Sequence, residues 1–257
     1  MIYSPSGFWG TRKTNPKLIY FNNNTLYIIE KARKNILHDI YPISDIVCIE
    51  TGNILLYSWI TISGLYKDNW ISSKIEYNAV SEHFFRDFIR LIRSKMFGIG
   101  TKAADKYGEQ FDFLQKTDYK YSSYGRESIL AGETLKNIAY QPERWRPFLS
   151  YFKRIAVSSH LTVLTDKEWI FLSEISGAGP KKYAIKKRYV PYSKITGVTE
   201  IDKKNKTENP TEPIEVLIRL LSGEEVRLCF SKDNINTADI KEVITSNAKV
   251  CHNCIEA

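Results

Sequence analysis

A repeated pattern, Pro-x-Ser-x-Ile, constrains the fold of this chain more than any other feature. It occurs in the segment Tyr41–Glu50 (YPISDIVCIE) and again in Tyr189–Ile201 (YVPYSKITGVTEI). In both places, apolar runs typical of a β-hairpin precede the pattern, and further strand-like runs and an amphipathic helix follow it. The repeat therefore predicts two similar, mainly β domains. A chain of 257 residues is long enough for two domains.

The segments before the two patterns both read as hairpins. Residues 17–30 (KLIYFNNNTLYIIE) contain two β-prone runs on either side of Asn22–Asn24, and asparagine tolerates left-handed backbone conformations in turns. In the second half, Leu161–Leu164 and Trp169–Leu172 lie on either side of a polar turn. Leu18 and Leu26 precede Leu161 and Trp169 by one constant offset, so this hairpin repeats without a gap.

More strands follow the first pattern. We predict a strand over Ile46–Ile49, a turn at Gly52-Asn53, a strand over Ile54–Ile62, a loop containing Gly64 and a strand over Trp70–Tyr77.

A helix is expected next, with Ser81 as its N-cap. Its spacing predicts one apolar face, which carries Phe84, Phe85, Phe88, Ile89 and Ile92. The arginines of this helix are expected mostly on its other faces: Arg86, Arg90 and Arg93.

The second copy shows the same succession in a cleaner form. Apolar residues alternate with other residues along Ile214–Leu220 and Val226–Phe230, and Ser222–Glu224 form a turn between the two runs, which predicts a hairpin. A helix over about Thr237–Ser246 follows, with Ile240, Val243 and Ile244 on its apolar side.

The residues between the two copies also have a pattern. Ala104, Tyr107, Phe111 and Leu114 form one helical stripe, so we expect a packed helical connector. Asp118–Gly125 (DYKYSSYG) reads as a loop. Glu133–Gln141 is expected to be the first strand of the second domain, and residues 203–213 an exposed loop.

Taken together, each half resembles the pleckstrin-homology-like domains of bacteria. The residues LTVLTDKEWIFLSE are similar to that family's second and third strands, VPYSKITGVTEI to its fourth, and IEVLIRLLSGEEVRLCF to a late hairpin. The resemblance implies an α+β, mainly β chain with two tandem barrel-like rolls, each closed by a C-terminal helix. The expected parts are domain 1 (1–97), a helical connector (98–125), domain 2 (126–250) and a tail (251–257).

Composition and charge indicate in which compartment and with which kind of partner the protein is expected. The net charge is +8 and the 37 basic side chains are spread along the chain, which suits anionic partners only mildly. No apolar run is long enough to span a membrane, and the N-terminus lacks the pattern of a signal peptide. Cys48 and Cys229 lie in apolar strand patterns. We therefore expect a cytoplasmic protein without disulfides.

Basic residues are the candidates for a binding site. In the headgroup-binding members of the family, the loops after the first and third strands line the pocket. The resemblance places seven residues in or beside the equivalent loops: Arg144, Arg146, Lys181, Lys182, Lys186, Lys187 and Arg188. Lys31, Arg33 and Lys34 occupy the matching loop of the first copy. Lysine and arginine can neutralise phosphate, but an exposed basic hairpin that keeps the protein in solution has the same pattern.

Other chemistry finds less support in the sequence. Cys251 and Cys254 form a single Cys-x-x-Cys close to the end of the chain, whereas a structural zinc site needs four ligands. We interpret this segment as a frayed tail, with a zinc shared by two copies as the alternative. Tyr183 and Tyr189 alternate with basic residues, but strand packing explains them better than base stacking.

No nucleophile, acid–base pair or phosphate loop is recognisable, and we expect neither a cofactor nor a metal. We therefore expect a non-enzymatic binding or scaffolding protein whose partner is another protein. The alternative is a peripheral module for anionic membrane lipid that uses the basic loops.

Overall fold

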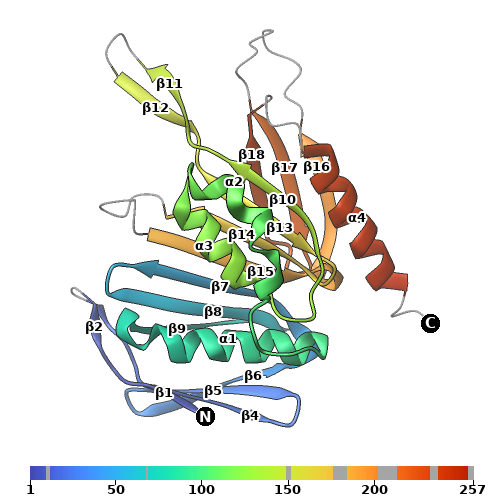
Figure 1. The fold of residues 1–257 in the computed structure, drawn as a ribbon. Helices are drawn as coiled ribbons and strands as arrows, with labels where there is room; N and C mark the ends of the chain where they lie inside the picture. The colour runs from blue at the N-terminus through green and yellow to red at the C-terminus, as the bar shows by residue number, and fades with distance from the viewer. Residues whose placement is uncertain are drawn as a thin grey trace. The chain divides into compact units, whose positions relative to one another are not determined.

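The computed structural model describes residues 1–9, 12–67, 69–148, 152–175, 184–201, 213–231 and 237–253. It is an α+β structure that is mainly β, with 53% of the residues in strands and a few helices (Figure 1). The chain forms two compact units. The first unit comprises Met1–Lys102 together with Ile175–Arg188, and the second comprises Ala103–Glu174 together with Tyr189–Ala257.

The first unit contains nine strands of the first repeat and one long helix. They are β1 (Ile2–Ser4), β2 (Phe8–Trp9), β3 (Arg12–Lys13), β4 (Lys17–Asn22), β5 (Thr25–Ala32), β6 (Asn35–Pro42), β7 (Ile46–Ile54), β8 (Tyr57–Tyr66), β9 (Asn69–Asn78) and α1 (Glu82–Phe97). One sheet has the order β1-β4-β5-β6, and β7, β8 and β9 follow one another in a second sheet.

The second unit has the elements of the second repeat. They are α2 (Asp112–Gln115), α3 (Tyr119–Ser128), β10 (Leu135–Gln141), β11 (Arg144–Phe148), β12 (Phe152–Val157), β13 (His160–Thr165), β14 (Glu168–Glu174), β15 (Ala184–Pro191), β16 (Ile195–Ile201), β17 (Ile214–Leu220), β18 (Glu225–Phe230) and α4 (Thr237–Asn253). Strand β15 is divided, because residues 184–188 group with the first unit and residues 189–191 with the second.

The two repeats share one order of elements. Four strands in antiparallel succession, β1-β4-β5-β6 or β10-β13-β14-β15, precede a three-strand meander, β7-β8-β9 or β16-β17-β18, and a helix ends each repeat. A small hairpin interrupts both repeats after the first strand. The prediction of barrels was wrong, since the sheets are not closed into barrels over the residues that the structure describes. Open sheet edges remain instead.

The Pro-x-Ser-x-Ile pattern forms the same short turn in both repeats. Each copy is one turn of 3-10 helix, Ile43–Asp45 in the first and Tyr192–Lys194 in the second. The prediction that the pattern marks the fourth strand itself was therefore inaccurate, because the turn joins the fourth strand to the fifth. A β-bulge follows at the same place in both copies, between Ile46 and Cys48 and between Ile195 and Gly197.

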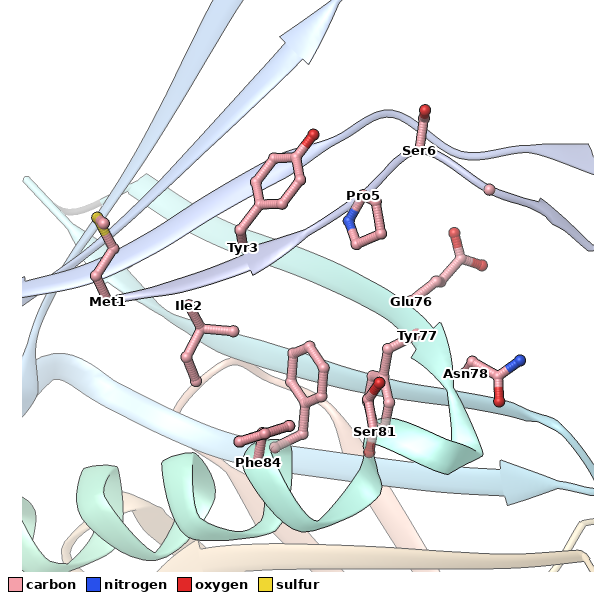
Figure 2. Close-up of a pocket in the computed structure, with 12 residues that line it drawn as sticks. Met1, Ile2, Tyr3, Pro5, Ser6, Glu76, Tyr77, Asn78, Ser81 and Phe84 are labelled. Atoms are coloured by element: carbon pink, nitrogen blue, oxygen red, sulfur yellow. The ribbon is translucent and has the colours of Figure 1, made fainter.

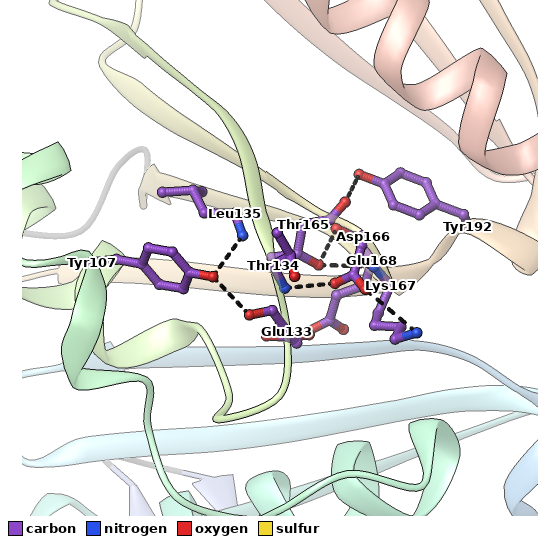
Figure 3. A network of polar contacts seen from close by, with 9 residues as sticks. All are labelled: Tyr107, Glu133, Thr134, Leu135, Thr165, Asp166, Lys167, Glu168 and Tyr192. Atoms are coloured by element: carbon purple, nitrogen blue, oxygen red, sulfur yellow. Dashed lines mark hydrogen bonds and ion pairs between the residues drawn. The ribbon is translucent and has the colours of Figure 1, made fainter.

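The residue after the proline ties this turn to the preceding hairpin. In the first repeat the Ile43 N–H donates to the carbonyl oxygen of Asn24 at 2.9 Å, and in the second the Tyr192 N–H donates to that of Lys167 at 3.3 Å. The Tyr192 hydroxyl also donates to the carbonyl oxygen of Thr165 at 3.0 Å (Figure 3). The pattern thus connects the fourth strand of each repeat to the fifth and is hydrogen-bonded to the preceding hairpin.

The network around Tyr192 extends to the start of β10. In Figure 3, the Thr134 N–H donates to Asp166, a residue of the same β13–β14 turn. The distance from Thr134 N to Asp166 Oδ1 is 2.7 Å. Tyr107 donates its hydroxyl hydrogen to the carbonyl oxygen of Glu133 at 2.9 Å and accepts from the Leu135 N–H at 3.1 Å. The segment before β10 is therefore fixed to the rest of the second unit by hydrogen bonds.

The hairpins predicted around polar turns are confirmed, with Asn23 and Gly223 in left-handed conformations (φ 53° and 79°). The turn predicted at Gly52-Asn53 was wrong. Strand β7 runs on to Ile54, and the turn is at Leu55-Leu56, inside the run expected to be one strand. Gly64 also lies within β8 rather than in a loop.

Helix α1 packs largely as predicted, but three of its details differ. Phe85, Phe88, Ile89 and Ile92 are buried, whereas Phe84 is 61% exposed. Arg93 is fully buried, although it was expected on another face. Ser81 precedes the helix without a side-chain capping bond, and Asn78 instead accepts from the Val80 N–H, at 3.0 Å from its Oδ1.

The predicted connector helix is replaced over Asp105–Gln115 by two 3-10 turns and the four-residue α2, but its stripe is buried as expected, with Phe111 and Leu114 fully inaccessible. The loop predicted over Asp118–Gly125 was wrong, because α3 covers most of it. Gly125 allows this helix to approach its neighbours, since a Cβ here would lie 2.6 Å from the Phe111 ring and 2.8 Å from Leu161. Helix α4 continues to Asn253, so Cys251 belongs to a helix end rather than to a frayed tail. Residues 203–212 lie outside the described residues.

Candidate functional site: strand edges and basic residues

Strand β7 pairs along its outer edge with β15, a strand that comes from the second repeat. In the first unit the order is β15-β7-β8-β9, so residues 184–188 lie along the outer edge of β7. Ion pairs fix this added strand. The Arg188 guanidinium donates to Glu50 through Nη2 at 2.6 Å and Nε at 3.2 Å, and Lys186 Nζ lies 3.3 Å from the same carboxylate oxygen. Glu50 therefore recognises two basic side chains at alternate positions of an extended segment.

This geometry gives two of the seven predicted binding residues a structural partner. Lys186 and Arg188 lie in a strand and share the carboxylate of Glu50, so part of their charge is neutralised within the first unit. The sequence analysis missed Glu50. The only local signal was an acidic residue that ends the buried run Ile46–Ile49. The contact joins residues 138 positions apart, which local spacing does not indicate.

The other predicted residues are placed as follows. Lys187 lies in β15 between Lys186 and Arg188, and Arg144 is an exposed residue of β11. Arg146 lies in the same strand, but its side chain is not among those that the structure describes. Lys181 and Lys182 lie outside the described residues. Residues 144 and 146 belong to the second unit and residues 186–188 to the first.

The first repeat has a cavity between the two loops that the resemblance singled out. This cavity, of about 770 Å³, is lined by residues before β4 and by the β5–β6 turn: Ser6, Thr14, Asn15, Pro16, Lys31, Ala32 and Arg33. Lys31 and Arg33 are exposed there. Arg33 adopts φ 53°, a left-handed conformation that asparagine or glycine adopts more readily than arginine. A basic residue thus occupies a strained turn position beside a cavity.

Strand β16 is the counterpart of β7 in the second repeat. It follows the same turn and has the same bulge, but it is the outer strand of the sheet β16-β17-β18. Thr196, Thr199 and Glu200 are exposed. A Cβ built on Gly197 meets no atom within 4 Å, so the space beside the bulge is open. Over the described residues, no strand pairs with the outer edge of β16, while α4 packs against β16 and the turn before it.

His160 lies in the core of the second unit, and burial changes its pKa. His160 is buried against the rings of Phe171 and Phe230, at centroid distances of 5.5 and 4.8 Å. Burial disfavours the charged ring and lowers its pKa to about 4. Burial likewise raises the pKa of the Tyr41 and Tyr121 hydroxyls. These groups are packed within the structure rather than presented to a substrate.

Among the residues whose placement is described, no three His, Cys, Asp or Glu side chains are grouped to hold a metal ion. Within the same residues, no helix combines the length and the apolar character that crossing a bilayer requires.

Comparison with known proteins adds no identification to this geometry. No protein-family model and no curated protein matches the chain.

Proposed function

We propose that this chain is a non-enzymatic, cytoplasmic protein-binding module built from two pleckstrin-homology-like repeats, and that the outer edge of β16 accepts an extended segment of a partner. One observation carries the proposal. The equivalent edge of β7 already holds an added strand, residues 184–188, whereas β16 is an outer strand of its sheet. Because an exposed edge presents unpaired N–H and C=O groups, a partner strand can extend the sheet there.

The residues of β16 support this reading. Natural edge strands are often protected by lysine, proline, other charged residues or a bulge; Ile195–Ile201 contains no lysine or proline, and its protection is limited to one bulge and Glu200. Thr196 and Thr199 are β-branched and exposed, which suits pairing with a neighbouring strand. Thr199 stands where the first repeat has Glu50, so β16 need not select the basic side chains that β7 binds.

Lysines introduced into β16 are expected to abolish partner binding. In a pull-down from native lysate, we expect Gly197→Lys/Thr199→Lys to lose at least tenfold of a stoichiometric partner that the unchanged protein recovers, since edge lysines oppose strand addition. Leu221→Lys is the control, because Leu221 is exposed in the β17–β18 turn and is not a residue of β16. Equal recovery by all three proteins, or no partner at all, would count against the proposal.

A second candidate function is binding of an anionic lipid headgroup, which the cavity beside Lys31 and Arg33 favours. We expect Lys31→Ala/Arg33→Ala to reduce sedimentation with vesicles rich in phosphatidylserine several-fold, and the binding to fall with salt. Arg86→Ala/Lys102→Ala removes the same charge from exposed positions and serves as the control.

The basic residues of the second repeat form a separate arm of this test. If they bind the headgroup, replacing Lys181, Lys182, Lys186 and Lys187 by alanine weakens sedimentation as well. Equal pelleting with neutral and anionic vesicles, or none with either, would exclude both versions.

A further inference from the structure

The Leu55-Leu56 turn presents two large apolar side chains to solvent. Leu55 is 58% and Leu56 64% exposed, and Leu55 adopts φ 55°. A left-handed conformation is sterically unfavourable for leucine, and two-residue hairpin turns favour asparagine and glycine. The β4–β5 turn of the same unit follows this rule with Asn23. Neither stability nor solubility accounts for leucines at this turn, so they indicate a surface that is covered by something else.

The turn is joined to a pocket at the start of α1. The Leu56 carbonyl oxygen accepts from the Ala79 N–H at 2.9 Å, and Val80, the next residue, is 76% exposed. Residues on both sides of Ala79 and Val80 line the pocket. It measures about 610 Å³ and is lined by β1 and the segment after it, by the end of β9, and by Ser81, Phe84 and Phe85.

Figure 2 shows how the pocket is built. Ile2 is directed from β1 toward Phe84, whereas Tyr3 points the opposite way. Phe85 is buried and stacks on Tyr77 at a centroid distance of 3.9 Å, which makes this wall rigid. Phe84 is 61% exposed and lies at the pocket beside Ser81. The lining thus combines aromatic side chains with four polar residues, Ser6, Glu76, Asn78 and Ser81, and such a mixture can take up an apolar group with a polar group beside it.

The charges around this surface select the kind of partner. Glu76 lines the pocket, but its charge is already matched, because Lys74 Nζ lies 3.4 Å from its Oε1 and the Tyr57 hydroxyl donates to the same oxygen. Glu82 is the first residue of α1. The side-chain amide of Asn53, two residues before Leu55, donates to Glu82, and the distance from Asn53 Nδ2 to Glu82 Oε2 is 3.1 Å. Arg86 and Asp87, one helical turn further along, are opposite in charge. Glu82 would repel an anionic bilayer, whereas it would attract a basic side chain that lies beside an apolar one.

We propose that Leu55, Leu56, Val80, Phe84 and the adjoining pocket form a docking surface for a segment of a partner protein. The segment places a large apolar side chain in the pocket and a lysine or arginine beside Glu82. This surface is independent of the β16 edge, because β16 belongs to the second unit.

A random peptide library displayed on phage and selected on the full-length chain is the probe. The chain carries Gly197→Lys/Thr199→Lys during selection, so that the β16 edge cannot supply the binders. We expect enrichment of peptides with a large apolar residue close to a lysine or arginine. A synthetic peptide of that consensus should bind Phe84→Asp at least tenfold more weakly. It should bind Phe113→Asp unchanged, since Phe113 is similarly exposed (56%) in the second unit.

Two further variants test the chemistry of the surface. Glu82→Lys should weaken the consensus peptide at least fivefold, and a peptide with glutamate in place of its basic residue should recover the loss. Leu55→Asn/Leu56→Gly should also weaken binding, while the thermal midpoint rises by about 2–4 °C because the turn is relieved of strain.

Three outcomes would overturn the proposal. The first is no enrichment, or peptides that bind Phe84→Asp as well as the unchanged protein. The second is binding to phosphatidylserine vesicles that Leu55→Asn/Leu56→Gly abolishes, which would assign the leucines to a bilayer. The third is a concentration-dependent dimer that Phe84→Asp dissociates, which would assign the surface to a second copy of the chain. A normal thermal transition for Phe84→Asp shows that loss of binding is not loss of fold.

Discussion

Replacing Gly64 by alanine is expected to destabilise the first unit by about 2–3 kcal/mol, the upper part of the range for overpacking a well-packed core. Gly64 is buried opposite the bulge that follows the first Pro-x-Ser-x-Ile turn. A Cβ at this position would lie 2.6 Å from the backbone oxygen of Asp45 and 3.2 Å from the Ile46 Cα. Because both atoms belong to the backbone of the turn, no side chain can rotate away to make room.

Gly197 provides the matched control for this substitution. It lies in the equivalent bulge of the second repeat, where an added Cβ meets nothing within 4 Å. Gly197→Ala should therefore leave stability unchanged or raise it by about 0.5 kcal/mol, because alanine loses less backbone entropy on folding. Urea unfolding of both variants measures the difference. A Gly64→Ala protein as stable as the Gly197→Ala protein would show that the turn yields, contrary to this account.

Acidification is expected to remove about 3 kcal/mol of stability through His160. The pKa of the buried ring is about 4, below its ordinary value of 6.5, because burial disfavours the charged form. Between these two values the unfolded chain binds a proton that the folded chain does not bind, so stability falls as the pH falls. Each unit of pKa difference corresponds to about 1.4 kcal/mol.

The measurement is urea unfolding between pH 7 and pH 4 for the unchanged protein and for His160→Leu. The difference between the two proteins isolates His160 from the other titrating groups of the chain. Its partners within the second unit are the Ser158 carbonyl oxygen, 3.2 Å from Nδ1, and two phenylalanine rings, so a leucine should be accommodated. If both proteins lose stability in parallel over this range, the ring does not titrate as described.

Local sequence signals predicted the hairpins because their turns carry residues with a backbone preference. Asn23 and Gly223 adopt left-handed conformations, and strands alternate on either side of them. The Leu55-Leu56 turn has no asparagine or glycine, and it lies within the apolar run Ile54–Ile62. The sequence therefore predicted one continuous strand there. Gly52, taken as a turn residue, serves packing instead, since a Cβ there would lie 2.1 Å from the Trp59 ring.

Long-range packing decided the elements that the sequence did not predict. Helix α3 has a tyrosine- and serine-rich sequence of low helical propensity, and it is stabilised because Tyr121, Ser122 and Gly125 are buried in the second unit. The candidate site likewise depends on a contact between residues that are distant along the chain. The basic residues were visible in the sequence, but their carboxylate partner, Glu50, is distant along the chain.

The sharing of β15 has a consequence for how the protein can be divided. The sequence repeats are separate along the chain, yet residues 184–188 of the second repeat fold with the first unit. A fragment that ends after α1 therefore lacks the strand that covers β7 and leaves Glu50 without Lys186 and Arg188. The boundary between the sequence repeats and the boundary between the compact units therefore differ in this chain, and residues 184–188 belong to the second repeat but to the first unit.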